Sequence, residues 1–235
     1  MLNPSSGIKG LHVNDSETFS APPMPVSQGH LASVQTGLNF VNTLDLWPTP
    51  HDHLDTPEAA LDWLVDNDLL HKEARAELLH RYEDAPGAGR AMLGRLRRVR
   101  EAMRSVLEAQ AGRQRPDPTD LAEINRALRT HYVYELVEGP DGVSLGHRHQ
   151  GDPVDGAAAR LAESIARQLI QGAAARLKVC ENPQCRWVFK DTSPTGQRKW
   201  CSMRSCGNRA KVARHRARYK AHPLTSPSPE FPLPL

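Results

Sequence analysis

Residues 180–220 read CENPQCRWVFKDTSPTGQRKWCSMRSCGNRAKVARHRARYK and contain all four cysteines of the 235-residue chain. The cysteines form two pairs, Cys180 with Cys185 and Cys201 with Cys206, with four residues inside each pair and fifteen between the pairs. Two short pairs on two turns bring four thiolates together at little cost in loop-closure entropy, which suits a tetrahedral zinc ion. Because protein thiolates fill all four positions, we expect the zinc to be structural and not catalytic.

Two disulfides, or a redox switch built on the same thiols, are the alternatives to a metal site. The N-terminal residues contain no charged segment that leads into an apolar one, so we expect the chain to stay in the cytoplasm. No apolar run approaches the ~20 residues needed to span a membrane. Cysteines in a reducing compartment are more often metal ligands or catalytic groups than disulfides, which favours zinc.

The residues around the cysteines predict a small zinc module. Asn182-Pro183 and Gly207 allow the chain to turn at each pair. Residues 186–191 have a strand pattern, 192–196 form a turn, and 197–200 are expected to return as a second strand. Asn208 is a good N-cap for a helix over 209–221. This order predicts a treble-clef-like fold with a small apolar core, formed by Trp187, Val188, Phe189, Trp200, Val212 and Tyr219.

Positive charge is concentrated in this module. Residues 180–222 contain eleven Lys or Arg residues and two acidic residues, whereas the whole chain has a net charge of only +3. No acidic residue occurs between positions 192 and 222. A mildly acidic body therefore carries a strongly basic C-terminal module, which points to a polyanionic partner at that end.

The predicted C-terminal helix carries its charge on two ridges. On a helical wheel one ridge contains Lys211, Arg214 and Arg218, and the opposite ridge contains Arg209, Arg216 and Lys220. Val212 and Tyr219 lie between them and are expected to pack on the zinc knuckle. Arg198, Lys199 and Arg204 add charge near the second cysteine pair.

These nine basic residues are our candidates for nucleic-acid contact. Lys and Arg side chains would bind phosphates in a salt-dependent way, and arginine could read base edges in the major groove. The alternative is that the charge run is simply a solvated helix face. Acidic residues that would neutralise it at i,i+4 are missing, which favours a bound partner. DNA is the expected partner, and RNA or an acidic protein is the alternative.

The rest of the chain predicts an α+β, helix-rich domain. Helices with apolar stripes are expected in 31–46, 58–70, 72–83, 90–111, 119–129 and 154–177. Thr56-Pro57 and Thr119 are the predicted helix starts, and the PGAG of 86–89 is expected to break the chain. Residues 131–149 alternate in polarity and predict a β-hairpin. The inward-facing residues are predicted to include Leu44, Leu121, Leu128, Leu169 and Ile170.

Composition divides the chain into four predicted segments. Residues 1–29 and the proline-rich 222–235 have no packing pattern and are expected to be disordered. Residues 30–177 form the helix-rich domain, and 178–221 form the zinc module.

Three other polar groups are candidates for function. His51 with His53, and His147 with His149, are H-x-H pairs that could donate metal ligands, although such pairs are more often solvated. Asn39, Asn42 and Asp45 form a polar stripe that could cap a neighbouring segment or recognise an effector. No catalytic triad signature, P-loop or Gly-rich dinucleotide motif is present, so we expect no enzymatic activity.

The string RKWCSMRSCGNRAKVARHRAR closely resembles the CGNR zinc-finger family, named for the stretch from Cys206 to Arg209. The strings LNFVNTLD and DTPEAALDWLVDNDLL resemble the ABATE domain, the N-terminal half of the same stress-induced transcription regulators. The two matches bracket residues 30–220. The resemblance implies an α+β N-terminal domain, a treble-clef zinc finger, DNA binding and a regulatory role.

Three functions follow as hypotheses. The first is a bacterial-type, zinc-dependent DNA-binding transcription regulator whose N-terminal domain senses a signal or mediates assembly. The second is a zinc-finger adaptor that binds an acidic protein or RNA. The third, which only the histidine loops favour, is an enzyme with its site in the N-terminal domain.

Overall fold

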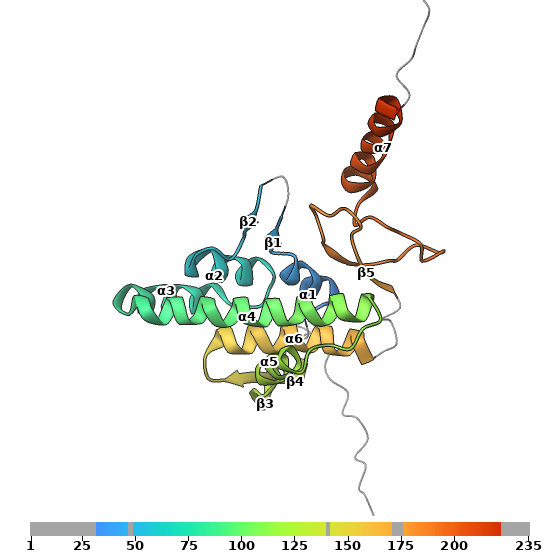
Figure 1. Cartoon of the computed structure of the whole chain (residues 1–235). Coiled ribbons are helices and arrows are strands. Elements are labelled where there is room, and N and C mark those ends of the chain that lie inside the picture. Colours follow the sequence, from blue (N-terminus) through green and yellow to red (C-terminus); the bar gives the residue numbers. More distant parts are fainter. Residues whose placement is uncertain (1–31, 47–48, 140–141, 171–175, 222–235) are drawn as a thin grey trace, which may run out of the picture.

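A computed structural model describes residues 32–46, 49–139, 142–170 and 176–221. It is helix-rich, with three two-stranded antiparallel sheets, and this confirms the predicted α+β class (Figure 1). The two terminal segments that we expected to be disordered, 1–29 and 222–235, lie outside the described residues.

Helix α1 (Val34–Val41) is shorter than the apolar spacing predicted. Ser33 caps its start by accepting a hydrogen bond from the Thr36 N–H. The Thr43 hydroxyl donates to the Phe40 carbonyl and helps to end the helix. Leu44 therefore lies in strand β1 (Leu44–Asp45), which pairs with β2 (His51–Asp52) in a segment expected to be a loop.

Helices α2 (Pro57–Asp66), α3 (Lys72–Asp84) and α4 (Pro86–Ala111) follow. The Thr56 cap is confirmed, because its hydroxyl accepts from the Ala59 N–H at 3.1 Å. The PGAG stretch was wrongly expected to lie outside a helix. The chain does turn at Ala85, but 86–89 form the first turn of α4, where Pro86 needs no N–H partner. A Cβ at Gly89 would lie only 3.2 Å from the Tyr82 ring, so glycine permits this close packing.

Helix α5 (Pro118–Leu128) is capped by Asp117 and not by Thr119 as predicted. The Asp117 carboxylate accepts from the backbone N–H of Thr119 at 2.8 Å and from its hydroxyl at 2.7 Å. Ile124 faces the core, whereas Leu121 was wrongly placed inside, since it is 40% exposed. The predicted hairpin is confirmed as β3 (His131–Gly139) and β4 (Gly142–Gln150).

Helix α6 (Pro153–Ile170) ends before the predicted residue 177. Residues 171–175 lie outside the described part of the chain, and strand β5 (Leu177–Val179) begins where the helix was expected to end. Leu169 packs partly buried against the core as predicted, whereas Ile170 is 83% exposed and was wrongly predicted to face inward.

The main core lies between α1, α4 and α6, with α4 and α6 running side by side (Figure 1). Phe40, Met103 and Leu161 are among its fully buried side chains. The same core includes Leu177 and Val188, which belong to strands on either side of the first cysteine pair. The cysteine module is therefore packed onto the helical body and shares its hydrophobic core.

A buried ion pair fastens the β1–β2 hairpin to α4. Arg100 is only 3% exposed, and its guanidinium donates to both oxygens of Asp52, at 3.0 Å for the Nη2–Oδ2 contact. It also donates to the Thr43 hydroxyl and to Glu101. Burial would raise the pKa of Asp52, but the Arg100 hydrogen bond, the Leu54 N–H and the charges of Arg100 and Arg97 together lower it.

Candidate metal centre

The first cysteine pair lies in the turn between two short strands. Strand β5 pairs antiparallel with β6 (Val188–Lys190), and Cys180 and Cys185 occupy the connection. The Cys180 N–H donates to the Trp187 carbonyl at 2.8 Å, and the Cys185 N–H donates to the Asn182 carbonyl at 2.9 Å. The predicted strand over 186–191 is confirmed in β6.

The predicted partner strand over 197–200 is wrong. Strand β6 pairs with β5, and residues 197–200 form no strand in the structure. Their backbone is used elsewhere, because the Lys199 carbonyl accepts from the Glu181 N–H at 2.9 Å and the Arg198 N–H donates to the Asp191 carboxylate at 2.8 Å. The segment therefore stabilises the turn that contains the first cysteine pair.

Of the second cysteine pair, Cys206 lies in a π-helical turn, η3 (Met203–Gly207), that continues into α7 (Asn208–Ala221). Ser202 caps this unit, since its hydroxyl accepts from the Ser205 N–H at 3.4 Å. Asn208 was wrongly predicted as the N-cap. Its backbone is already helical, with φ −65° and ψ −41°, and its amide donates to the Arg204 carbonyl.

The four predicted zinc ligands come together in space. The sulfur atoms of Cys180, Cys185, Cys201 and Cys206 all lie within 4.8 Å of one another. The distances from the Cys201 sulfur to the Cys185 and Cys206 sulfurs are both 3.7 Å. Four thiolates at about 2.3 Å from a tetrahedral zinc ion would be separated by about 3.8 Å, so the arrangement fits the metal.

Burial and charge around the sulfurs also favour a cation. Cys180, Cys185 and Cys206 are buried, and all four cysteines are free thiols. In the absence of a cation, burial and the neighbouring cysteines raise the pKa of Cys185 to about 11. Burial opposes ionisation of Cys206 as well, but hydrogen bonds from Asn182 and Arg209 lower its pKa to about 6. A divalent cation would stabilise all four as thiolates.

Two donors to Cys206 were not predicted in this role. The Asn182 amide lies 3.5 Å from the Cys206 sulfur, and the Arg209 guanidinium lies 2.9 Å from it. The sequence predicts Asn182 only as a turn residue and Arg209 only as a nucleic-acid contact. Both occur within four residues of a cysteine, which is the one sequence signal that could have indicated them.

Asp191 organises the loop between β6 and the second cysteine pair. It is 1% exposed and accepts hydrogen bonds from the Ser193 N–H and hydroxyl and from the Arg198 N–H. The Lys178 ammonium lies 3.1 Å from its carboxylate. Burial would raise the pKa of Asp191, but these donors outweigh burial and hold the pKa well below its usual range.

Polar contacts fasten the module to the helical body. The Asn42 side-chain amide donates to the Val188 carbonyl at 2.8 Å and accepts from the Val188 N–H at 3.0 Å. Arg104 of α4 donates to the Arg186 carbonyl at 2.7 Å. Asn42 thus has the capping role that we considered for the polar stripe of Asn39, Asn42 and Asp45.

The nine basic candidates divide into two groups. Three are engaged within the module: Arg198 lies over the Phe189 ring and donates to the Cys201 carbonyl, Lys199 pairs with Glu181, and Arg209 contacts Cys206. Five have exposed side chains on η3 or α7, namely Arg204, Lys211, Arg214, Arg216 and Arg218. Lys220 also lies in α7, but its side chain is outside the described part.

Helix α7 does not pack on the cysteine module as predicted. Val212 and Tyr219 are 49% and 60% exposed, so the expected docking stripe between two ridges is wrong. Trp187, Phe189 and Trp200 do pack around the cysteines, whereas Val188 joins the main core. Figure 1 shows α7 projecting away from the body, and every residue from Lys211 to Tyr219 is exposed.

The histidine pairs do not form a second metal site in the described part of the chain. His51 and His53 contact each other edge to face, with ring centroids 4.6 Å apart. Among the described residues, the four cysteines are the only histidine, cysteine or acidic group with metal-binding geometry. The side chain of His147 is not described, and His149 lines a separate cavity near α6.

The fold and the four-cysteine site define a zinc-finger protein with a helix-rich N-terminal domain. Residues 176–219 match the family described as "CGNR zinc finger". Residues 35–174 match the ABATE family, described as "Putative stress-induced transcription regulator". The chain belongs to the ABATE family, and it carries the CGNR zinc finger directly after that domain. No curated protein matches the sequence.

None of the helices within the described ranges is both long and apolar enough to cross a membrane.

Proposed function

We propose that this protein is a zinc-dependent transcription regulator that binds DNA through α7. The observation that carries the proposal is the exposure of α7, which has six Lys or Arg residues, no acidic residue and no packing partner for residues 211–219 within the described part. The zinc would hold η3 and the start of α7 in place, and the helical body would sense a signal or mediate assembly. The proposed function involves no enzymatic reaction.

The charges of α7 suit a phosphate backbone. Lys211, Arg214 and Arg218 lie on one side of the helix, and Arg209 and Arg216 on the other. With no docking stripe on the body, both sides are open, so the helix could lie in a major groove with cations directed at both strands. Each neutralised phosphate releases counterions, which makes the affinity fall steeply with salt.

The contacts within the finger support different roles for the nine candidate residues. We propose that Arg204, Lys211, Arg214, Arg216, Arg218 and Lys220 contact nucleic acid directly. Arg198, Lys199 and Arg209 would mainly position the finger, because each already has a partner there. Their positive charge still adds to the field that attracts a polyanion.

The decisive experiment is selection of genomic DNA fragments by the purified, zinc-loaded, full-length protein, followed by affinity measurements from 50 to 300 mM salt. We expect an enriched sequence and a linear decrease of log K with log salt. In the double variant Arg214→Gln/Arg218→Gln, the slope should fall by about 2 and binding should weaken on all sequences. The control Arg90→Gln/Arg113→Gln removes two exposed arginines from the body and should leave the slope unchanged. If the two double variants show the same dependence of log K on log salt, α7 is not the DNA contact.

A second candidate function is a zinc-finger adaptor. The observation in its favour is the exposure of three apolar side chains on η3 and α7, with Met203 50%, Val212 49% and Tyr219 60% exposed. An acidic protein could meet these residues together with the surrounding arginines, and RNA could stack on Tyr219. Absence of DNA binding at 50 mM salt, together with binding of a specific protein that Tyr219→Ala abolishes, would favour the adaptor.

A further inference from the structure

Arg186 has a backbone conformation that is unusual for a residue with a side chain. It follows the predicted zinc ligand Cys185 directly, and its φ angle is 56°. In this left-handed region the Cβ atom of an L-residue approaches the following carbonyl oxygen, so glycine is favoured there. An arginine keeps this conformation only where the surrounding structure holds it, and such residues cluster at functional sites.

The left-handed turn at Arg186 serves the cysteine that precedes it. The backbone N–H of Trp187, the next residue, donates a hydrogen bond to the Cys185 sulfur. The Trp187 carbonyl accepts from the Cys180 N–H at 2.8 Å, so both backbone groups of Trp187 are used within the first cysteine turn. A donor to a ligand sulfur orients the thiolate and stabilises its negative charge. The conformation of Arg186 therefore helps to set the geometry of a metal ligand.

The C-terminal part of α4 holds Arg186 through both its backbone and its side chain. The Arg104 guanidinium donates through Nη2 to the Arg186 carbonyl at 2.7 Å. The Arg186 guanidinium lies 3.6 Å from the Glu108 carboxylate. Arg104 and Glu108 also pair with each other at 3.2 Å, one turn apart on the helix. Two side chains of the body thus fix the residue that follows Cys185.

Arg104 is packed more tightly than an ordinary surface arginine. Its side chain is 12% exposed. Its other terminal nitrogen, Nη1, is inaccessible to solvent and has no hydrogen-bond partner within the described part of the chain. An unpaired buried donor costs free energy, which the contacts of the same guanidinium with Arg186 and Glu108 offset. Because a packed guanidinium has few alternative positions, the Arg186 carbonyl has a fixed donor.

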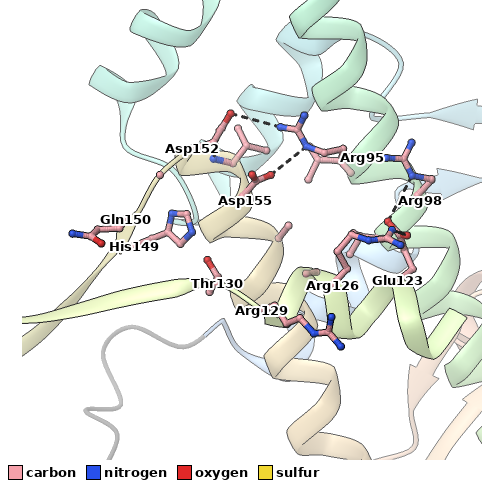
Figure 2. Close-up of a pocket in the computed structure, with 16 residues that line it drawn as sticks. Arg95, Arg98, Glu123, Arg126, Arg129, Thr130, His149, Gln150, Asp152 and Asp155 are labelled. Carbon is pink, nitrogen blue, oxygen red and sulfur yellow. Dashed lines mark hydrogen bonds and ion pairs between the residues drawn. The ribbon is translucent and has the colours of Figure 1, made fainter. Parts of the chain in front are cut away.

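Helix α4 uses its arginines to align several elements. Arg95 and Arg98, near the middle of the helix, pair with Asp155 of α6 at 3.3 Å and with Glu123 of α5 at 3.6 Å (Figure 2). These two arginines contact carboxylates within the body, whereas Arg104 contacts a backbone carbonyl of the finger. One helix therefore holds both the neighbouring helices of the body and the first cysteine turn.

We propose that Arg104 and Glu108 are positioning residues of the metal centre. They hold Arg186 in the left-handed conformation, and this conformation directs the Trp187 N–H at the Cys185 sulfur. The helical body thereby contributes to the zinc affinity of the finger. This inference rests on the zinc ion of the proposed function, but it does not depend on nucleic-acid binding.

The zinc affinity of the full-length protein, measured by competition with a coloured chelator, tests the proposal. Arg104→Met removes the guanidinium but keeps an apolar side chain, and zinc binding should weaken about 10-fold. Arg90→Met is the matched control, because Arg90 is an exposed arginine on the same helix. It should bind zinc like the wild type. Thermal unfolding with saturating zinc confirms that both variants fold.

A substitution at Arg186 separates positioning from general stability. Glycine adopts positive φ without strain, so the left-handed turn no longer needs support from α4 in the Arg186→Gly variant. In that background Arg104→Met should weaken zinc binding by less than about 3-fold, because the two substitutions act on one interaction. If Arg104 only stabilised the body, the loss would be the same in both backgrounds.

Hydrogen exchange reports on the ligand contact itself. In zinc-loaded Arg104→Met, the Trp187 amide should exchange about 10-fold faster than in the wild type. The Arg198 amide donates to Asp191 at 2.8 Å in the other loop of the finger and should not change.

The proposal is overturned if Arg104→Met binds zinc like the wild type, or if its loss is the same in the Arg186→Gly background. It is also overturned if the Trp187 and Arg198 amides change alike. A wild type that takes up no zinc would overturn the zinc dependence of the proposed function as well, so the two failures are distinguishable.

Discussion

The side-chain amide of Asn42 forms both hydrogen bonds that a neighbouring strand would form with Val188. It donates to the Val188 carbonyl at 2.8 Å and accepts from the Val188 N–H at 3.0 Å. Asn42 is the C-cap of α1 in the body, and Val188 begins β6 of the zinc finger. One side chain therefore satisfies both backbone groups of Val188 and joins the finger to the body.

The first prediction concerns this contact. Asn42→Ala leaves a buried N–H and a buried C=O of Val188 without partners, so the free energy of unfolding should fall by about 2–4 kcal/mol. Urea unfolding of the zinc-loaded protein measures the change. Asn39→Ala is the matched control, because Asn39 lies on the same helix, is exposed and bonds only to Gln35 at 2.8 Å. It should change the free energy by less than about 0.5 kcal/mol. Equal effects of the two substitutions would contradict the assigned role.

The second prediction concerns removal of the metal. The purified protein should contain one zinc ion per chain, and a strong chelator should remove it. Four close sulfurs then lose the charge that stabilises them as thiolates. In hydrogen exchange, amides of 180–207 should lose their protection, whereas amides in the middle of α4 and α6 should remain protected. Full protection of 180–207 without metal would show that the zinc is not structural.

A single substitution sharpens the test of the metal site. Cys206→Ser should weaken zinc binding by at least about 100-fold, because a hydroxyl replaces one of the four thiolate ligands. Ser205→Ala changes the neighbouring exposed side chain in η3 and should retain one zinc per chain. Competition with a coloured chelator measures both affinities.

The clustering of the four cysteines could be predicted because they are local in sequence. Each cysteine pair encloses a turn of four residues, and the residues that favour these turns can be identified in the sequence. The same holds for the Thr56 cap, where Pro57 follows the hydroxyl directly, and for the β3–β4 hairpin, where alternating residues flank a turn.

The contacts that the sequence did not predict join segments far apart in the chain, or depend on which surfaces face each other in the fold. Asn42 and Val188 are 146 residues apart, and nothing in either local pattern shows the pairing. Leu177 was predicted as the end of α6, although it pairs with Lys190 of β6 in a strand. Val212 and Tyr219 share one side of a helical wheel, but a wheel does not show whether any surface faces that side. In the structure they remain exposed.

The third prediction follows from this exposure of α7. An isolated helix of 14 residues is marginally stable in water, and Arg214 with Arg218 forms a like-charge i,i+4 pair that destabilises it. Amides of 211–219 should therefore exchange rapidly in the free protein. Binding of a DNA duplex neutralises the charges, so the exchange rates should then fall by about 10-fold or more. Protection of 211–219 without DNA would indicate that α7 packs on a surface.

A related stability measurement compares two aromatic residues of the finger. Phe189 is 9% exposed and packs around the cysteines, whereas Tyr219 is 60% exposed. Phe189→Ala should lower the free energy of unfolding by about 3 kcal/mol. Tyr219→Ala should change it by less than about 0.5 kcal/mol. A large effect at Tyr219 would restore the docking stripe that the sequence predicted.

The last prediction concerns pH and the Asp52–Arg100 ion pair. The pKa of Asp52 is lowered in the folded protein from its ordinary value of 3.8. The ion pair therefore stabilises the fold fully above about pH 5, and this stabilisation is lost as the pH falls through 3.8 toward the folded pKa. Asp52→Asn should lower the free energy of unfolding at pH 7 by about 2–4 kcal/mol, because it leaves the 3% exposed Arg100 without its main partner.

The pH profile separates this ion pair from general acid effects. Asp55→Asn is the control, because the Asp55 side chain is exposed and only its carbonyl accepts from Arg97. Wild type and Asp55→Asn should lose stability in parallel between pH 5 and 3. Asp52→Asn should show a shallower loss over the same range, since one fewer carboxylate takes up a proton on unfolding. Parallel slopes for all three proteins would mean that Asp52 does not titrate with the fold, and the ion pair would then not stabilise it.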